Sequence, residues 1–433
     1  MGHIFVFILC IDLIFFLYCN RYKKSYALIY TLIDIAGDIM SSIRYCVFIL
    51  SLVMLASFAS AQTQTSMFNG APKSGNSPPT TVFTDASIGI KSAWVWFFGD
   101  EAYTQPWINI TGNPGWTNRE RFGLVVMPDG SIILMGGINT TSSTYYSDVW
   151  RSTDEGVHWT QQTANAPWGG RSGLTSVAMP DGSIVLMGGT LSTGVQNDTW
   201  RSIDEGVTWT LVNASSGWKK RDYLFSVVMP DGSIVIGAGA LSLNNCANDT
   251  WRSTDEGAHW TLMNASPGWM PREIPATVSM PDGNIILAGG WSAYGGVNRH
   301  DQNDTWKSTD NGATWTEVNA SSGWLIRDTF PAVRMPDNSI VIMGGGSLIP
   351  TTLNDTWRSN DEGSHWTEIN ERPGWEAREG LNAVTLPDGS IVLIGGNDNT
   401  NSPGIMFNDT WRMQPAGILR SIFPNWLRTV FLR

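Results

Sequence analysis

The chain has 433 residues, of which 45 are glycine and 22 are tryptophan, and only 15% are charged. Such a composition favours many short strands joined by tight turns. The formal net charge of -11 argues against nucleic acid as the main partner, because binding to phosphates needs an excess of Lys and Arg. Three of the four cysteines precede residue 62, so we expect no disulfide framework in the rest of the chain.

Two apolar stretches lie within the first 61 residues. Read from Met40, the second stretch has the features of a secretory signal peptide, with Arg44 near its start and the small residues Ala59-Ser60-Ala61 at its end. We therefore expect residues 40–61 to be a signal peptide that is removed from a secreted protein.

The apolar residues 1–39 form an N-terminal extension that is not translated if synthesis starts at Met40. The alternative is that Ile4–Cys19 anchors the chain in a membrane, although this stretch is short against the roughly 20 apolar residues of a spanning helix. In both cases the residues that follow lie outside the cytoplasm. Residues 62–91 are then a linker.

Six copies of a unit of about 50 residues follow between Met127 and Trp411, a period that is typical of propellers and solenoids. In the copy Met229–Trp260, a Pro-Asp-Gly turn precedes an apolar run, and a polar loop separates that run from an Asp-x-Trp element. The copy ends with the segment Ser-x-Asp-x-Gly-x-x-Trp, here called the Ser-x-Asp segment.

Four short strands, called a to d, fit each unit. In the second unit they are Thr175–Met179, Ser183–Met187, Asp198–Arg201 and a strand that begins near Trp209. Strand b is apolar throughout, as expected for a strand that is covered on both faces. Six radially arranged units predict an all-β fold, a six-bladed β-propeller of four-stranded antiparallel blades, over residues 92–415.

The ends of the repeat region favour a closed ring over the alternative of an open solenoid. In the sixth unit, Met413-Gln414-Pro415 stands where the Ser-x-Asp segment is expected. Residues Ser92–Trp107 read as a degenerate copy of the missing c–d part. We therefore predict that an N-terminal strand closes the ring by completing the last blade, which removes free sheet edges.

The repeat resembles two known families. Gly188-Gly189, Asp198-Thr199-Trp200 and Trp209-Thr210 are similar to the elements of the kelch repeat. The Ser-x-Asp segment resembles the Asp-box, or BNR repeat, of sialidases and other secreted propellers. Its five copies are Ser152–Trp159, Ser202–Trp209, Ser253–Trp260, Ser308–Trp315 and Ser359–Trp366. The resemblance implies a propeller but no single function, because one fold hosts many activities.

The Asp-box aspartates are expected to be structural. An Asp side chain accepts backbone N–H groups in a tight turn, and the following glycine permits a positive φ. These residues are Asp154, Asp204, Asp255, Asp310 and Asp361. Three of the five histidines lie in these segments without a second type of ligand nearby, so we predict neither a metal nor another cofactor.

Recognition is expected on the face that carries the b–c loops and the d–a connections, because alternate hairpin turns lie at opposite ends of a sheet. Each d–a connection contains a tryptophan and, after two further residues, an arginine; the arginines are Arg119, Arg171, Arg221, Arg272, Arg327 and Arg378. Such a ring could hold an anionic ligand. The alternative is that each arginine pairs with the acid next to it and fixes the packing of the blades.

The residues that break the symmetry of the repeat are the stronger candidates for binding. The fourth b–c loop, Trp291–Asn303, is the longest and adds Trp291, Tyr294, Arg299 and His300. Exposed aromatic side chains suit stacking against a sugar or a protein hot spot. We therefore predict a binding module for a glycan or an extracellular protein.

The alternative function is a sialidase-like glycoside hydrolase. The Asp-box resemblance implies three arginines on the substrate carboxylate, a tyrosine nucleophile with a glutamate, and an acid/base residue. The sequence offers only Arg272-Glu273-Ile274-Pro275 as a distant match to the Phe/Tyr-Arg-Ile-Pro motif of that family. An enzyme is therefore the less favoured prediction, and no catalytic residue is assigned.

Residues 416–433 leave the repeat pattern. Apolar residues there recur at helical spacing, and three arginines add positive charge, although Pro424 interrupts the pattern. This amphipathic tail suits a membrane surface or a partner helix. Packing against the repeats is the alternative.

Overall fold

The computed structural model describes residues 106–111, 114–242, 245–294, 297–347, 352–370, 373–399 and 404–414, together with five short strands outside these ranges. Those strands are β1 (Phe68–Ala71), β2 (Val82–Asp85), β3 (Trp94–Trp96), β36 (Leu419–Ser421) and β37 (Thr429–Phe431). The predicted N-terminal extension and signal peptide, residues 1–61, lie outside the described residues.

The chain divides into two compact units. The first comprises Met1–Trp94 and Ser421–Arg433, and in it β1, β2 and β37 form an antiparallel sheet. The described parts of the predicted amphipathic tail are the strands β36 and β37, so they are extended and not helical; the remainder lies outside the described residues. Within the described part of the chain, no helix has the length and hydropathy needed to span a bilayer.

The second unit, Val95–Arg420, contains an antiparallel sheet for each repeat. Sheet 1 has β5 (Gly123–Val126), β6 (Ile132–Met135), β9 (Val149–Ser152) and β10 (Thr160–Thr163). Sheet 2 has β12 (Thr175–Ala178), β13 (Ile184–Met187), β16 (Thr199–Ser202) and β17 (Thr210–Asn213). Sheet 3 has β18 (Phe225–Val228), β19 (Ile234–Gly237), β22 (Thr250–Ser253) and β23 (Thr261–Asn264).

The remaining three sheets follow the same pattern. Sheet 4 has β25 (Ala276–Ser279), β26 (Ile285–Tyr294), β27 (Val297–Ser308) and β28 (Thr316–Asn319), and β24 (Arg272–Glu273) joins it beside β26. Sheet 5 has β29 (Ala332–Arg334), β30 (Ile340–Gly346), β31 (Thr352–Ser359) and β32 (Thr367–Asn370). Sheet 6 has β33 (Asn382–Thr385), β34 (Ile391–Ile394), β35 (Thr410–Met413) and β4 (Ile108–Thr111).

Short strands extend some of the loops between the second and third strands: β7 (Ile138–Asn139) with β8 (Thr144–Tyr145), β14 (Thr190–Leu191) with β15 (Gly194–Val195), and β20 (Ala240–Ser242) with β21 (Asn245–Cys246). The strand β11 (Arg171–Ser172), from the connection before sheet 2, pairs with β14. The four strands predicted for the second repeat are confirmed within about one residue of their ends.

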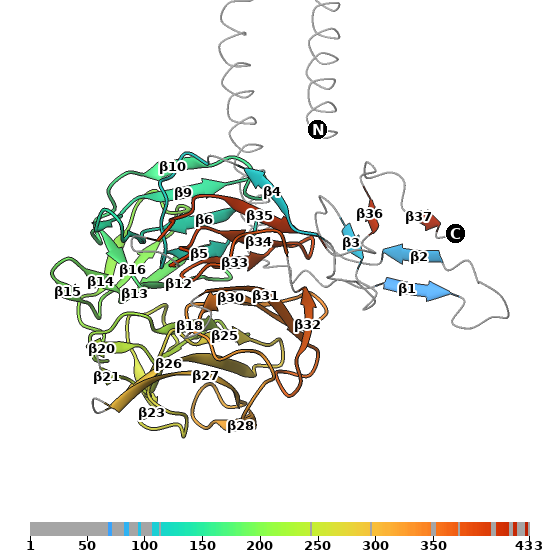
Figure 1. Ribbon diagram of the computed structural model, residues 1–433. Coiled ribbons are helices and arrows are strands. Elements are labelled where there is room, and N and C mark those ends of the chain that lie inside the picture. Colours follow the sequence, from blue (N-terminus) through green and yellow to red (C-terminus); the bar gives the residue numbers. More distant parts are fainter. Residues whose placement is uncertain are drawn as a thin grey trace, which may run out of the picture. The chain divides into compact units, whose positions relative to one another are not determined.

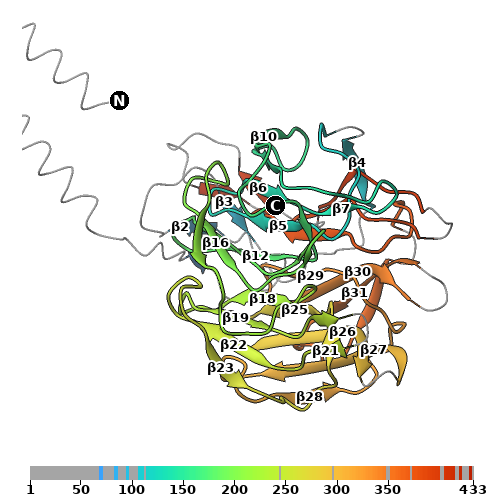
Figure 2. The ribbon, with the colours of Figure 1, turned by 90° about the vertical axis from the view of Figure 1, so that its left-hand side faces the viewer.

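The first strands of the sheets surround the middle of the second unit. Contacts link β5, β12, β18, β25, β29 and β33 in that order, and β33 also contacts β5. Figure 1 shows β5, β6, β9 and β10 in order from the middle outward, and Figure 2 shows β18, β19, β22 and β23 side by side. Every sheet therefore presents its first strand to a common centre.

The hydrophobic core lies between neighbouring sheets. One cluster joins Ile133 of sheet 1 with Ile184 of sheet 2, and another joins Ile394 of sheet 6 with Ile132 of sheet 1. All residues of β6, β13, β19 and β34 are buried, since each of these strands is covered on both faces. This explains why the second strand of each repeat is apolar without alternation.

The outer strand of sheet 6 comes from the N-terminal side of the unit. Trp411 of β35 pairs with Asn109 of β4, so the predicted N-terminal strand completes the last sheet. Trp107 also packs edge-on against Trp375, with ring centroids 6.1 Å apart. In sheets 1 to 5 the corresponding pairs join the d–a tryptophan to the Ser-x-Asp tryptophan: Trp116–Trp159, Trp168–Trp209, Trp218–Trp260, Trp269–Trp315 and Trp324–Trp366.

Backbone hydrogen bonds also connect each sheet to the next. A glycine that follows the buried apolar run of the second strand donates its N–H to the carbonyl of the arginine that precedes the next sheet. The bonds run from Gly137 to Arg171, Gly189 to Arg221, Gly239 to Arg272, Gly290 to Arg327, Gly345 to Arg378 and Gly396 to Arg119. The last of these bonds links sheet 6 to sheet 1.

Candidate functional site

A ring of backbone groups surrounds the common centre. In each repeat the second residue after the d–a arginine has a positive φ between 48° and 62°. These residues, called the central ring, are Arg121, Gly173, Tyr223, Ile274, Thr329 and Gly380. Such φ values are unfavourable for residues other than Gly, Asn and Asp, and most of all for the β-branched Ile274 and Thr329.

Hydrogen bonds between neighbouring members explain this backbone conformation. The N–H of a member donates to the carbonyl of the member in the preceding sheet, over distances of 2.8 to 3.1 Å. The bonds run from Arg121 to Gly380, Gly173 to Arg121, Tyr223 to Gly173, Ile274 to Tyr223 and Gly380 to Thr329. The left-handed conformation turns the peptide groups along the ring, so these bonds offset part of the strain.

Two cavities meet at the central ring. The inner cavity, of about 290 Å³, is lined by four consecutive residues from each sheet region, for example Gly173–Ser176 and Tyr223–Ser226. The second cavity, of about 430 Å³, is called the acidic cavity. Both are lined by Arg121, Tyr223, Ile274 and Thr329, which therefore form the boundary between them.

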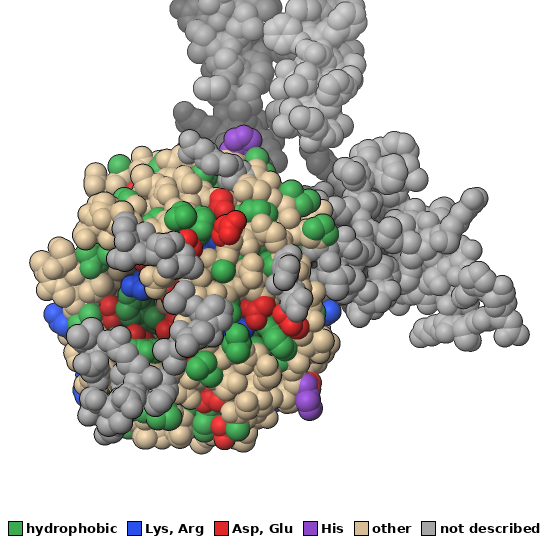
Figure 3. All heavy atoms as spheres, viewed as in Figure 1, with side chains coloured by type: hydrophobic (Ala, Val, Ile, Leu, Met, Phe, Trp, Pro, Cys, Tyr) green, Lys and Arg blue, Asp and Glu red, His purple; other side chains and the backbone are tan. Residues whose placement is uncertain are grey.

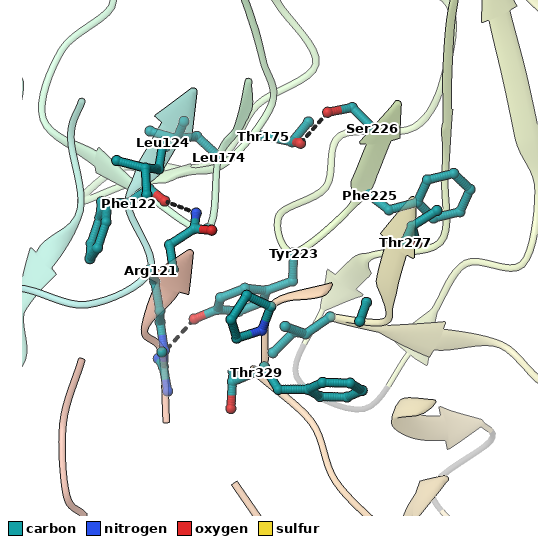
Figure 4. Close-up of a pocket in the computed structure, with 18 of the residues that line it drawn as sticks. Arg121, Phe122, Leu124, Leu174, Thr175, Tyr223, Phe225, Ser226, Thr277 and Thr329 are labelled. Atoms are coloured by element: carbon teal, nitrogen blue, oxygen red, sulfur yellow. Dashed lines mark hydrogen bonds between the residues drawn. The ribbon is translucent and has the colours of Figure 1, made fainter. Parts of the chain in front are cut away.

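The Arg121 and Tyr223 side chains point toward one another at this boundary (Figure 4). Arg121 Nη1 donates a hydrogen bond of 2.8 Å to the Tyr223 hydroxyl, and its guanidinium carbon lies 5.4 Å from the tyrosine ring centroid. Burial raises the pKa of Tyr223, so its hydroxyl stays neutral. The pair thus presents a positively charged donor group and a phenol to the acidic cavity.

Carboxyl groups give the acidic cavity its charge. Asp222, Glu273, Asp328 and Glu379 line it together with Arg121. In the space-filling view, acidic side chains gather around a hollow in the face shown (Figure 3). Arg121 Nη2 lies 3.8 Å from Glu379, and its Nε lies 3.5 Å from the buried Glu120. Carboxyl groups therefore outnumber the cationic groups among the described lining residues.

Burial favours the protonated form of three of these carboxyl groups, Asp222, Asp328 and Glu379. It raises the pKa of Asp222 to about 6 and that of Glu379 to about 7, although Arg121 acts in the opposite direction on both. Burial also raises the pKa of Asp328. Desolvation destabilises the charged form of a carboxyl, so Asp222 and Glu379 bind protons near neutral pH. The acidic cavity therefore holds groups that can donate or accept a proton.

The d–a arginines lie in the interior. Arg171, Arg221, Arg272, Arg327 and Arg378 are at most 1% exposed, and none of them lines the two cavities. Each is paired in the structure with the aspartate of the Asp-x-Trp element of its own sheet: Asp198, Asp249, Asp304, Asp355 and Asp409, with Arg119 on Asp148 in sheet 1.

Arg272 shows the geometry in detail. Its Nη1 and Nη2 lie 2.7 and 2.8 Å from the two Asp304 oxygens, and Nη1 also donates to the Gly289 carbonyl over 2.8 Å. Asp304 accepts a further bond of 2.7 Å from the indole N–H of Trp306. The alternative that each arginine pairs with the acid next to it is therefore wrong for Arg272, because its partner is Asp304. The adjacent Glu273 lines the acidic cavity.

Among the symmetry-breaking residues of the fourth loop, the structure brings Trp291 to the acidic cavity. Trp291 lies in β26, where its backbone pairs with Glu273 of β24 and Asp301 of β27. The backbones of Tyr294, Arg299 and His300 belong to β26 and β27, while their side chains lie outside the described part of the structure.

The Ser-x-Asp segments form tight hydrogen-bonded turns. In the second, Asp204 Oδ1 accepts the Thr208 N–H over 2.8 Å and the Ser202 hydroxyl over 2.9 Å, and the Trp209 indole donates to the Gly206 carbonyl over 3.1 Å. Asp154, Asp255, Asp310 and Asp361 make the corresponding bonds. In the described residues, no group of His, Cys, Asp and Glu side chains is arranged to hold a metal ion.

Sequence reasoning did not select Arg121 and Tyr223 as site residues. The signal was the variation at their position, where the repeats carry Arg, Gly, Tyr, Ile, Thr and Gly two residues after the invariant d–a arginine. The acids before this position were noted only as partners for the d–a arginines. In the structure the neighbouring arginines pair with other aspartates, and four of these acids line the acidic cavity.

Comparison with known proteins gives limited likenesses. No family model matches the chain. The chain is 28% identical over 142 residues to a xyloglucanase from a Paenibacillus species, and the match covers 31% of this chain and 13% of that protein. The chain thus spans only a small part of this relative. The solved structure of YjhT superposes on 69% of this chain and 95% of its own length, with a TM-score of 0.54 and 15% identity, which shows likeness of fold alone.

Proposed function

We propose that the chain is an extracellular six-bladed β-propeller, with kelch-like and Asp-box repeats, that binds a glycan at the acidic cavity. The signal-peptide features of residues 40–61 support the location. The cyclic contacts of the first strands support the propeller. Blades of four antiparallel strands around a centre also explain the bonds that link sheet 6 to sheet 1.

The single observation that carries the proposal is the lining of the acidic cavity. Its volume of about 430 Å³ lies within the usual range of small-ligand sites, roughly 300–1,000 Å³. Carboxylates accept hydrogen bonds from sugar hydroxyls, and Arg121 donates to sugar oxygens. The Trp291 side chain supplies an aromatic wall against which the apolar face of a sugar ring stacks.

A second candidate function, glycoside hydrolysis, is favoured by the protonation of two carboxyls. The pKa of Asp222 is about 6 and that of Glu379 about 7, so each is partly protonated at neutral pH. Glycosidases need a carboxyl that is protonated near the operating pH, together with an ionised one. The partial similarity to a xyloglucanase supports the same candidate.

A glycan array together with a hydrolysis assay on xyloglucan tests both functions. We expect the purified protein to bind glycans without releasing reducing sugar. Trp291→Ala should weaken binding at least about tenfold, and His158→Ala should not, because His158 is highly exposed in a Ser-x-Asp turn. A folded protein that binds no glycan would refute the first function. Sugar release that Glu379→Gln abolishes would establish the second.

A further inference from the structure

The boundary between the two cavities is filled by side chains that fit into the space left by two glycines. A Cβ atom at Gly173 would lie 2.9 Å from the Tyr223 ring, and one at Gly380 would lie 2.6 Å from the Glu120 carboxylate. Tyr223 and Glu120 therefore extend over positions that have no side chain. Arg121 and Tyr223 line the acidic cavity at this boundary and are joined by a hydrogen bond, so this pair forms the floor of the cavity.

Every sheet region contributes to the lining of the acidic cavity. Arg121 precedes sheet 1, Val195 follows β13 of sheet 2, Tyr223 precedes sheet 3, and Trp291 belongs to sheet 4. Asp328 and Glu379 precede sheets 5 and 6. A cavity with a floor and with lining residues from all around the centre is a pit. It differs from a groove, which has two open ends.

We propose that the acidic cavity takes the end of a glycan chain, so that a terminal sugar residue enters the pit and contacts the Arg121–Tyr223 floor. The inference rests on the proposed glycan binding and specifies its substrate class. An internal residue of a long chain has continuations on both sides, and a pit that is closed at its floor leaves no room for the continuation on that side.

The groups at the floor suit the part of a sugar that distinguishes a chain end. A terminal residue carries a free hydroxyl where an internal residue carries a glycosidic bond. The Arg121 guanidinium donates, while the Tyr223 hydroxyl and the Glu379 carboxyl can also accept. These groups lie close together, since Arg121 Nη1 bonds to Tyr223 over 2.8 Å and Nη2 lies 3.8 Å from Glu379. A methyl group on that hydroxyl would bury these polar groups without a partner.

The test uses paired oligosaccharides of four kinds: xyloglucan, cello-, laminari- and chito-oligosaccharides. Each is printed on an array with native ends and with both ends blocked, as a methyl glycoside with a methylated terminal residue. Calorimetry then measures the affinity of each pair for the full chain. We expect the native member of a pair to bind at least about tenfold more tightly than the blocked member.

Two variants check that the floor reads the chain end. Tyr223→Phe removes only the hydroxyl and should reduce the preference for native ends, while His158→Ala should leave it unchanged. Equal binding of native and blocked members would overturn the inference and leave glycan binding intact. Failure of every native oligosaccharide to bind the folded protein would overturn the proposed function, and the inference with it.

Discussion

The Arg121 guanidinium donates a hydrogen bond of 2.8 Å to the Tyr223 hydroxyl, although 102 positions separate the two residues in the chain. The bond joins the connection before sheet 1 to the connection before sheet 3. It spans Gly173, the member of the central ring that belongs to sheet 2. The centre of the unit is therefore connected by side chains as well as by backbone bonds.

Loss of the Tyr223 hydroxyl should weaken this connection. Tyr223→Phe removes a hydrogen bond from a charged donor, a type that contributes roughly 1.5–3 kcal/mol. We expect the free energy of unfolding to fall by about 1–2 kcal/mol, since the contact of Arg121 with the aromatic ring remains. Urea unfolding measures the change. Tyr145→Phe, on the β8 strand, is the control, and an equal loss in both variants would contradict the prediction.

Two glycine substitutions separate backbone strain from steric contact. Gly173 and Gly182 both have a positive φ, but a Cβ at Gly182 meets nothing within 4 Å. The free energy of unfolding of Gly182→Ala should therefore fall only by the roughly 1–2 kcal/mol that an unfavourable φ costs. That of Gly173→Ala should fall by about 1–3 kcal/mol more, because the Tyr223 ring must move. Similar unfolding midpoints for the two variants would show that the position of the Tyr223 ring does not require the space beside Gly173.

The buried ion pairs should contribute far more to folding than the exposed ones. Asp304→Ala leaves the fully buried Arg272 without its carboxylate, which we expect to cost about 3–5 kcal/mol. The Arg201–Asp181 pair is partly exposed, and Arg201→Gln should cost less than about 1 kcal/mol. Chemical denaturation of the two variants at the same pH compares them. Comparable losses of stability in the two variants would mean that burial of the Arg272–Asp304 pair does not increase its contribution to folding.

Stability should fall as the pH rises through the range in which the acidic cavity ionises. The pKa of Glu379 in the folded state is about 7, above its ordinary value of 4.5, so the folded state binds more protons than the unfolded state between these values. The stabilisation is complete below about pH 4 and is lost as the pH rises through 7. Glu379→Gln should unfold with less pH dependence, and should be more stable than the natural chain by about 2–3 kcal/mol at pH 8.

Measurements of unfolding at pH 4.5 and pH 8 test that sign. Glu376→Gln provides the control, since Glu376 is exposed two residues before the d–a arginine. A natural chain that becomes more stable from pH 4.5 to pH 8, with Glu379→Gln following the same trend, would contradict the assigned direction of the pKa shift.

The docking of β4 onto sheet 6 should depend on Trp107. This side chain is 5% exposed and packs against Trp375, while the neighbouring Ile108 is 60% exposed. We expect Trp107→Ala to cost about 3–5 kcal/mol, as for other buried aromatic residues, and Ile108→Ala to have little effect. Thermal unfolding compares the two. If Trp107→Ala is as stable as Ile108→Ala, the packing of Trp107 against Trp375 does not hold β4 on sheet 6.

The strands were predictable from the sequence because six copies repeat the same local pattern. Turn residues mark the hairpins, and the unbroken apolar run Ile184–Met187 matches the buried β13. The gap after Trp411 and the degenerate copy before Trp107 predicted the pairing of β35 with β4. Each of these inferences uses neighbouring residues or a missing copy, and both are visible in a linear sequence.

The candidate site was less predictable, because its residues meet only through the arrangement of the sheets. The d–a arginines have an acid as the next residue, yet they pair with aspartates further along, as Arg221 does with Asp249. The spacing in the sequence could not show with which of two acids a buried arginine pairs. Trp291 was chosen as a candidate because it breaks the repeat. Tyr223 breaks it too, but at a single position within a connection of uniform length.

The pairing of β4 with β35 also has a consequence for the kinetics of folding. A ribosome synthesises β4 before any repeat, whereas β35 follows only after the sixth repeat is nearly complete. During synthesis β4 is therefore an edge strand without its partner, which exposes it to pairing with other chains. The contact that finishes sheet 6 is also among the longest-range contacts of the second unit, so its loop-closure entropy should slow the last folding step.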